Sequence, residues 1–136
     1  MFEINSTPPS SVSRVWWYRG EQFLLEVKRV DTDKELVIRF GQPKYKWLIY
    51  IYLFPKHPMF SIFDKATSLS NCYADNIPEL EMHGGITYFS KINTDGALSI
   101  KIGCDYCHYM DDAFDTKDSP EVFKDAEELF NKLCTK

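Results

Sequence analysis

The fold of this chain is decided by residues 86–102, which read ITYFSKINTDGALSIKI. Both ends of this stretch are rich in β-branched and aromatic residues, and Asp95-Gly96 lies between them. An Asp-Gly pair between two such runs is a strong signal of a β-hairpin, because a two-residue turn needs positive φ at its centre. The sequence therefore predicts that residues 86–92 and 97–102 pair as antiparallel strands.

The register of this hairpin predicts which residues meet beyond its strands. With Asp95-Gly96 as the turn, Thr94 faces Ala97, and the same register continued outward puts His83 opposite His108. A slip of one or two residues moves the partner of His83 only to about Cys107 or Tyr106. We therefore expect the segment around His83 to meet residues 103–111, which read GCDYCHYMD.

The first half of the chain contains further strand patterns. Residues 23–30 alternate well enough for a strand, residues 31–34 are typical of a turn, and residues 35–40 are interpreted as the return strand of a second hairpin. Residues 45–54 are β-branched and aromatic, which favours a central and well-buried strand. Residues 61–78 show no persistent period and are expected to form a long ordered loop or irregular layer.

The end of the chain predicts an amphipathic helix over residues 119–134. Asp118-Ser119-Pro120-Glu121 offers an N-cap, a proline in the first turn and an acidic group near the positive helix end. Apolar residues then recur with helical spacing at Val122, Phe123, Ala126, Leu129, Phe130 and Leu133. The expected fold class is α+β: a mostly antiparallel β-sheet built from hairpins, with this helix packed on one face.

The length and composition favour one folded domain over residues 1–136, with residues 1–13 as an extended or irregular arm. Hydrophobic residues make up 44% of the chain and aromatic residues 15%, which argues against disorder. We expect no secretory signal and no membrane span, because the longest apolar run, residues 47–54, is too short to cross a bilayer. A reducing bacterial cytoplasm is the expected location, where the four cysteines serve as thiols or metal ligands.

The charge is uneven along the chain. The formal net charge is -4, and residues 105–128 hold nine acidic side chains against Lys117 and Lys124. This region should repel nucleic acid and favour a basic protein partner. We therefore expect no direct contact with nucleic acid.

The segment after Gly103 offers several sets of metal ligands. A tight helical turn there would align residues three apart. The two series are Asp105, His108 and Asp111, and Cys104, Cys107 and Met110. The first series with His83 gives two imidazoles and two carboxylates, whereas the second with His83 and His108 gives a Cys₂His₂ set. Both sets suit Zn²⁺ or another divalent first-row metal, and a mixture that includes Cys107 is also open.

Other interpretations of these residues compete with a metal site. Cys104 and Cys107 can be small buried core residues, and His83 a hydrogen-bonded core histidine. The C-x-x-C-H spacing at residues 104–108 also matches the attachment pattern of c-type haem, but haem attachment belongs to exported proteins. A thioredoxin-like motif is disfavoured because it requires a βαβ context rather than an antiparallel hairpin.

Two other groups of residues admit a functional interpretation. His57 lies between Pro55 and Pro58, where a turn histidine is the simpler interpretation. Trp16-Trp17-Tyr18, followed by Arg19, can form a binding surface because Trp, Tyr and Arg dominate interface hot spots. Packing in the core or on an edge strand is the favoured alternative for this aromatic group.

The two segments that the hairpin brings together resemble a group of small phage-associated proteins. These proteins carry an HGG[LI]TY segment followed by a G-x-D-x-x-H-x-x-D segment, which match residues 83–88 and 103–111. A cysteine often follows the Asp in that pattern, whereas this chain has Tyr106 there and Cys107 one place later. The departure favours His83, Asp105, His108 and Asp111 as ligands, with Cys107 or Cys104 as substitutes.

The chain is also similar in size and composition to the small acidic inhibitors that phages use against CRISPR nucleases, including type II-A inhibitors of Cas9. This resemblance implies an anti-CRISPR protein that binds and occludes a host nuclease such as Cas9, with a metal that is structural rather than catalytic. A metal-dependent hydrolase at the same ligands is the alternative function. It would need an open coordination position for water.

The metal prediction is tested by elemental analysis with thermal unfolding before and after chelation. We expect near-stoichiometric zinc, whose removal lowers the melting temperature, and little metal in a His108→Ala variant. Metal-free wild-type protein whose stability does not change with chelator would contradict the prediction.

Overall fold

A computed structural model describes residues 3–6, 13–64, 82–83, 85–106 and 114–135. Its strands are β1 (Glu3–Ser6), β2 (Ser13–Gly20), β3 (Phe23–Asp31), β4 (Tyr45–Leu53), β5 (Tyr88–Thr94) and β6 (Ala97–Asp105). Its helices are α1 (Lys34–Phe40), α2 (Phe60–Asp64) and α4 (Pro120–Cys134). In the described part of the chain these elements form the predicted α+β fold.

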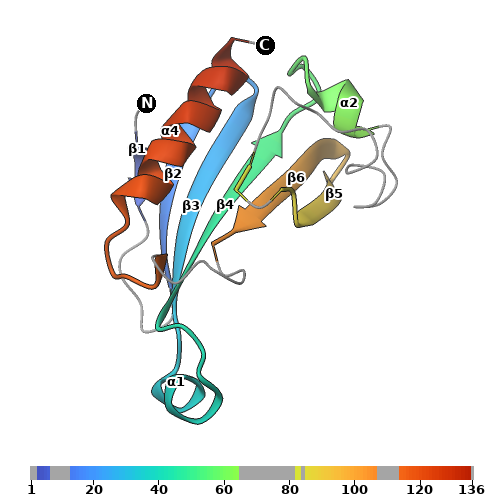
Figure 1. The fold of residues 1–136 in the computed structure, drawn as a ribbon. Coiled ribbons are helices and arrows are strands. Elements are labelled where there is room, and N and C mark those ends of the chain that lie inside the picture. The colour runs from blue at the N-terminus through green and yellow to red at the C-terminus, as the bar shows by residue number, and fades with distance from the viewer. Residues whose placement is uncertain (1–2, 7–12, 65–81, 84, 107–113, 136) are drawn as a thin grey trace.

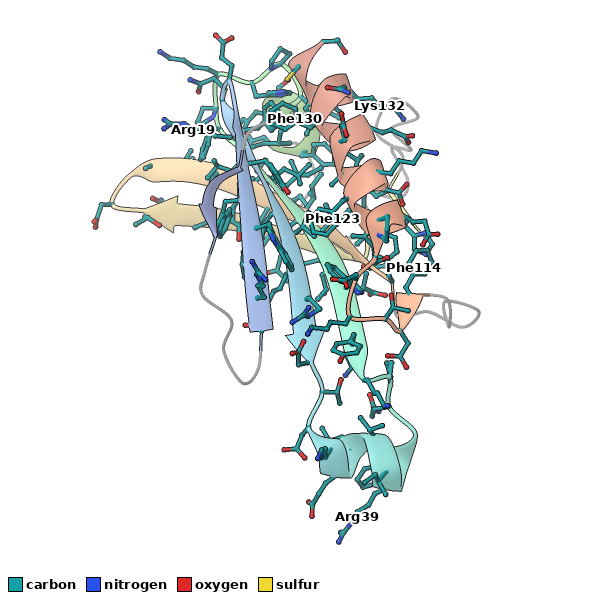
Figure 2. The ribbon with its side chains drawn as sticks, turned by 90° about the vertical axis from the view of Figure 1, so that its left-hand side faces the viewer. Arg19, Arg39, Phe114, Phe123, Phe130 and Lys132 are labelled. Atoms are coloured by element: carbon teal, nitrogen blue, oxygen red, sulfur yellow. The ribbon has the colours of Figure 1, made fainter. Side chains whose placement is uncertain are left out.

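The strands form a six-stranded sheet in the order β1-β2-β3-β4-β6-β5, and every pairing is antiparallel. Helix α4 crosses one face of the sheet over β2 and β3 (Figure 1). The β5–β6 hairpin extends to the side of the sheet that faces away from α4 (Figure 2). The sheet therefore has a face covered by α4 and an opposite face, which we call the open face.

The predicted hairpin register is confirmed. Thr94 pairs with Ala97, and the pairing continues without a break to Tyr88 and Gly103. Asp95 and Gly96 have φ values of 52° and 83°, as a tight two-residue hairpin turn requires. The Asn93 side chain accepts a hydrogen bond from the Gly96 N–H at 3.0 Å, which holds the turn closed.

The core lies between the sheet and α4. Strand β4 is central and buries alternate side chains from Trp47 to Leu53 on the α4 side, which confirms the strand predicted there. Helix α4 buries the predicted stripe on its inner face, with Phe123 partly buried. Phe123 and Phe130 lie between the helix and the sheet (Figure 2). Ser119 occupies the N-cap position, although its hydroxyl makes no capping hydrogen bond.

The predicted hairpin of residues 23–30 with 35–40 is wrong. Residues 34–40 form helix α1, and β3 pairs with β2 and β4 instead. The Asp33 carboxylate accepts a hydrogen bond from the Glu35 N–H at 2.8 Å, and Gly41 ends the helix with φ of 64°. These two caps favour the helix despite the β-branched residues within it, because they satisfy backbone groups that a short helix leaves unpaired.

The remaining predictions on the fold have mixed outcomes. Glu3–Ser6 of the expected N-terminal arm pairs with β2 as the edge strand β1. The expected loop over residues 61–78 begins with α2, and residues 65–78 lie outside the described part. No helix in the described residues is long and apolar enough to cross a membrane.

The His57 side chain connects the end of α4 to the turn after β4 by hydrogen bonds. The residue is 3% exposed. Its Nε2 lies 3.0 Å from the Leu133 carbonyl and its Nδ1 accepts a hydrogen bond from the Met59 N–H at 3.1 Å. The ring is therefore the neutral tautomer with the proton on Nε2. The sequence interpretation of His57 as a turn histidine agrees with this structural role.

We predict that His57→Ala lowers the free energy of unfolding by about 3 kcal/mol, because it removes two hydrogen bonds and leaves a buried donor and acceptor without partners. Urea denaturation measures this change. The matched control is Lys56→Ala at the exposed neighbouring position, which we expect to change stability by less than about 0.5 kcal/mol. Equal stability of the two variants would contradict the role of His57.

Candidate functional site

His83 lies in a short turn that packs on the end of β6. Its imidazole stacks on the Tyr106 ring, with ring centroids 4.3 Å apart and an interplanar angle of 14°. It also contacts the Phe114 ring edge to face at 5.2 Å. The sequence predicted that the segment around His83 meets residues 103–111, and the contact with Tyr106 agrees with this expectation. Tyr106 and Phe114, the residues on either side of 107–113, therefore both pack against the His83 ring.

Tyr106 connects this cluster to helix α4. The residue is 3% exposed, its N–H donates to the Trp47 carbonyl at 2.9 Å, and its hydroxyl donates to the Asp125 carboxylate at 2.8 Å. The position of the His83 ring thus depends on a tyrosine held by both the sheet and α4.

Asp105 belongs to the open face. We expected the chain to leave the strand at Gly103 and to place Asp105 in a helical turn, but β6 continues through Asp105. Alternate residues of a strand point to opposite faces, so buried Cys104 faces α4 whereas Asp105 shares the open face with its partner Leu48. The Thr87 hydroxyl lies 3.5 Å from the Asp105 carboxylate. We expected two series of ligands spaced three residues apart, one starting at Cys104 and the other at Asp105. Both starting residues lie in strand β6 and not in a helical turn.

Cys104 is enclosed in the core. The residue is 1% exposed, and this burial raises the pKa of its thiol to about 12. A thiol with such a pKa is protonated at neutral pH and is a poor metal ligand as it stands. Cys104 therefore fits the alternative of a small buried core residue.

The other predicted ligands, Cys107, His108 and Asp111, lie outside the described residues. Within the described ranges, no three His, Cys, Asp or Glu side chains are grouped closely enough to hold a metal ion. A hollow of about 240 Å³ borders His83 and is lined by Met82, Asp125, Glu128, Leu129 and Lys132. The metal site remains a prediction, and its described neighbourhood combines an imidazole with two carboxylates and an ammonium group.

A second candidate site lies on the open face, where the register places aromatic residues in one row across the sheet. In this row Trp17, Glu26, Tyr50, Gly103 and Tyr88 follow one another from β2 to β5. Gly103 leaves room for the Tyr50 ring, because a Cβ atom there would clash with Tyr50 Cδ1. Tyr50 and Tyr88 meet edge to face at 5.4 Å. The absence of a side chain at Gly103 thus lets two tyrosines meet across β6.

Lys101 lies among three tyrosines on this face. Its Nζ is 4.2 Å from the centroid of the Tyr50 ring, 5.2 Å from that of Tyr52 and 5.3 Å from that of Tyr88. Trp17 contacts Tyr52 at 5.6 Å and extends the aromatic surface to β2. Cation–π attraction to several rings restricts the ammonium group to one place. The face therefore presents a cation with a defined position, surrounded by aromatic rings.

Glu26 lies at the centre of the same face and is only 6% exposed. Its carboxylate accepts a hydrogen bond from the Tyr52 hydroxyl at 3.1 Å. Burial raises the pKa of Glu26 above its usual value of 4.5, against the opposing effects of the Tyr52 bond and of Lys101 and Lys28. Burial also raises the pKa values of Tyr50 and Tyr52. The centre of the open face is therefore poorly solvated even without a partner.

The two sides of the molecule carry different charges. The register assigns Arg19, Lys28, Lys46 and Lys101 to the open face, together with Glu26 and Asp105. Figure 2 shows Arg19 on the side of the sheet away from α4. The solvent side of α4 is mainly acidic, with Glu121, Glu127 and Glu128 exposed. Although the net charge of the chain is -4, the open face therefore has more cations than carboxylates.

No protein-family model matches this chain, and neither the curated protein sequences nor the solved structures give a match.

Sequence reasoning did not find the open face, although it considered one part of it. The strand pattern separates Trp17, which faces the open side, from Trp16 and Tyr18, which face α4. Trp16 stacks on Trp47 at 5.7 Å, as the core-packing alternative expected. The alternation Tyr50-Ile51-Tyr52 was an available signal, because two tyrosines on either side of a buried residue must share the opposite face.

We predict that Glu26→Gln is more stable than the wild type at pH 7 and that the difference disappears below about pH 4. Glu26 has a raised pKa in the folded protein, so the wild type loses stability as pH rises from the unfolded pKa through the folded one. Urea denaturation across this pH range measures the difference. Glu127→Gln, on the solvent side of α4, controls for the change in net charge. A wild type that gains stability over Glu26→Gln between pH 4 and 7 would contradict the prediction.

Proposed function

We propose that this protein is a non-enzymatic binding protein and that the open face of its sheet contacts a protein partner. The observation that carries the proposal is the row of aromatic residues around Lys101. Tryptophan, tyrosine and arginine are the residues that most often dominate binding energy at protein interfaces, and the open face contains Trp17, three tyrosines and Arg19. Lys101 and the tyrosines already contact one another, so these side chains lose little conformational entropy when a partner binds.

The same geometry favours a protein partner over a nucleic acid. Nucleic-acid bases stack on exposed faces of aromatic rings. The Tyr50 ring is less available for such stacking, because the Lys101 ammonium lies over it and the Tyr88 ring contacts it edge to face. The Glu26 carboxylate at the centre of the row opposes a phosphate backbone when it is ionised. The open face therefore fits a protein surface with polar acceptors and apolar side chains, and its rim cations select for acidic groups there.

The partner that we propose is a host nuclease, with Cas9 as the first to test, and the site of action is the bacterial cytoplasm. The sequence resemblance to phage proteins supports this choice. A protein bound through its open face turns the acidic solvent side of α4 outward. That side would repel the phosphates of guide RNA or target DNA, so one bound copy would both cover a surface and keep nucleic acid away from it.

A structural zinc ion, or another divalent first-row metal, is part of the proposal. Its ligands come from His83, Asp105, Cys107, His108 and Asp111. The packing of Tyr106 and Phe114 on His83 supports a role in fixing the segment between them against the body of the protein. The metal would then support the fold at the end of β6, where Asp105 borders the open face.

We predict that Tyr88→Ala weakens binding to guide-loaded Cas9 by at least about tenfold and weakens inhibition of DNA cleavage in parallel, because Tyr88 is the exposed tyrosine of the aromatic row and packs against Tyr50. Calorimetry and a cleavage assay measure the two effects. Glu127→Ala on the opposite side is the matched control and should bind as the wild type does, with thermal melting to verify that both variants are folded. Absence of wild-type binding would refute Cas9 as the partner, and equal binding by Tyr88→Ala would refute the open face as the contact.

A further inference from the structure

Helix α1 is an apolar projection at one end of the molecule. It lies beyond the end of the sheet, between β3 and β4, with Arg39 at its far side (Figures 1 and 2). None of its seven residues is buried. Leu36, Ile38 and Phe40 are 43%, 81% and 70% exposed, which makes α1 the densest group of exposed large apolar residues in the described chain. Such a concentration is typical of an interaction site.

The projection is held in a defined conformation. Asp33 caps the start of α1 and Gly41 caps its end, where the Gln42 N–H donates to the Leu36 carbonyl at 3.3 Å. At its base, the Thr32 N–H donates to the Lys44 carbonyl at 2.8 Å and joins the two connecting segments. The apolar side chains are thus presented on a fixed support, which reduces the entropy lost on binding.

A hollow of about 530 Å³ lies beside these exposed side chains, between α1 and the end of the sheet. It is lined by Asp31, Thr32, Lys34, Val37, Ile38, Lys44 and Tyr45. Ile38 therefore borders the hollow, whereas Leu36 and Phe40, one helical turn apart, protrude from another side of α1. A patch with both a projection and a recess can fit a copy of itself about a twofold axis, because each copy then supplies both parts.

The charges around the patch also favour a second copy of the chain over an anionic membrane. Asp33 and Glu35 alternate with Lys34, and Arg39 and Lys44 follow, all of them exposed. Such mixed charges can pair with those of a second copy rotated about a twofold axis. An anionic membrane would attract Lys34, Arg39 and Lys44 but repel Asp33 and Glu35, as well as a chain whose net charge is -4.

We propose that α1 and the adjacent hollow form a self-association surface, in which Phe40 of one copy enters the hollow beside Ile38 of a second copy. The surface lies at the end of the sheet, so the open face of each copy stays accessible in the pair. The assembly is then a symmetric dimer with two binding faces. This proposal is independent of the identity of the partner that the open face contacts.

The test is sedimentation equilibrium of the full chain from low to high micromolar concentration. We expect the average mass of the wild type to rise from 15.9 kDa towards twice that value, and the mass of Ile38→Glu to stay at 15.9 kDa at every concentration. Leu98→Glu is the matched control, because Leu98 is an exposed leucine, 47% accessible, in the distant β5–β6 hairpin. It should associate as the wild type does. Far-UV circular dichroism verifies that both variants are folded.

Three results would overturn the proposal. The first is a wild type that stays at the monomer mass throughout the range. The second is association by Ile38→Glu that equals that of the wild type, which would place the interface elsewhere. The third is flotation of a monomeric wild type, but not of Ile38→Glu, with phosphatidylglycerol vesicles, which would assign α1 to a membrane.

Discussion

The pairing of β4 with β6 is the contact on which the rest of the structure depends. It runs from Leu48–Asp105 to Leu53–Ile100 and joins the N-terminal strands to the β5–β6 hairpin, which lies much further along the sequence. Strand β4 is paired on both sides, so its alternate residues are forced to opposite faces along its whole length. That single constraint separates the core under α4 from the open face.

The two faces acquire different properties from the same strands. On the α4 side, Ile49, Ile51 and Ile102 are completely buried and pack under the helix. On the open side, the neighbouring residues Tyr50, Tyr52 and Lys101 form the aromatic group around a fixed cation. Because the acidic residues of α4 lie on the other side, the two surfaces of one small domain suit different neighbours. A protein contact on one side and repulsion of nucleic acid on the other can therefore coexist.

The predictions from sequence succeeded where local chemistry leaves little choice. Asp95-Gly96 fixes a tight turn, and the register follows from the turn by geometry. The apolar spacing in 120–134 is compatible only with a helix that lies on the core. The predictions failed where two local preferences compete. Residues 34–40 have strand-forming side chains but helix caps at both ends, and a helix of exposed apolar residues is not what a core pattern suggests.

The candidate sites show the same division. The meeting of His83 with the chain near Tyr106 was foreseeable because it follows from the hairpin register. The continuation of β6 to Asp105 was not, because it depends on the pairing with Leu48 of a strand remote in sequence. The open face was also not foreseeable as a whole, since its row draws residues from β2 to β5.

The amino-acid sequence by itself determined the turn, the register of the last hairpin, the central strand and the C-terminal helix, because each is specified by residues that are neighbours in the chain. Only the tertiary structure decided which aromatic residues share a face, that Cys104 is enclosed while Asp105 is not, and that α1 projects from the end of the sheet. The physical reason is that these properties depend on which strand lies beside which. That choice depends on burying the core residues of the strands together against the helices.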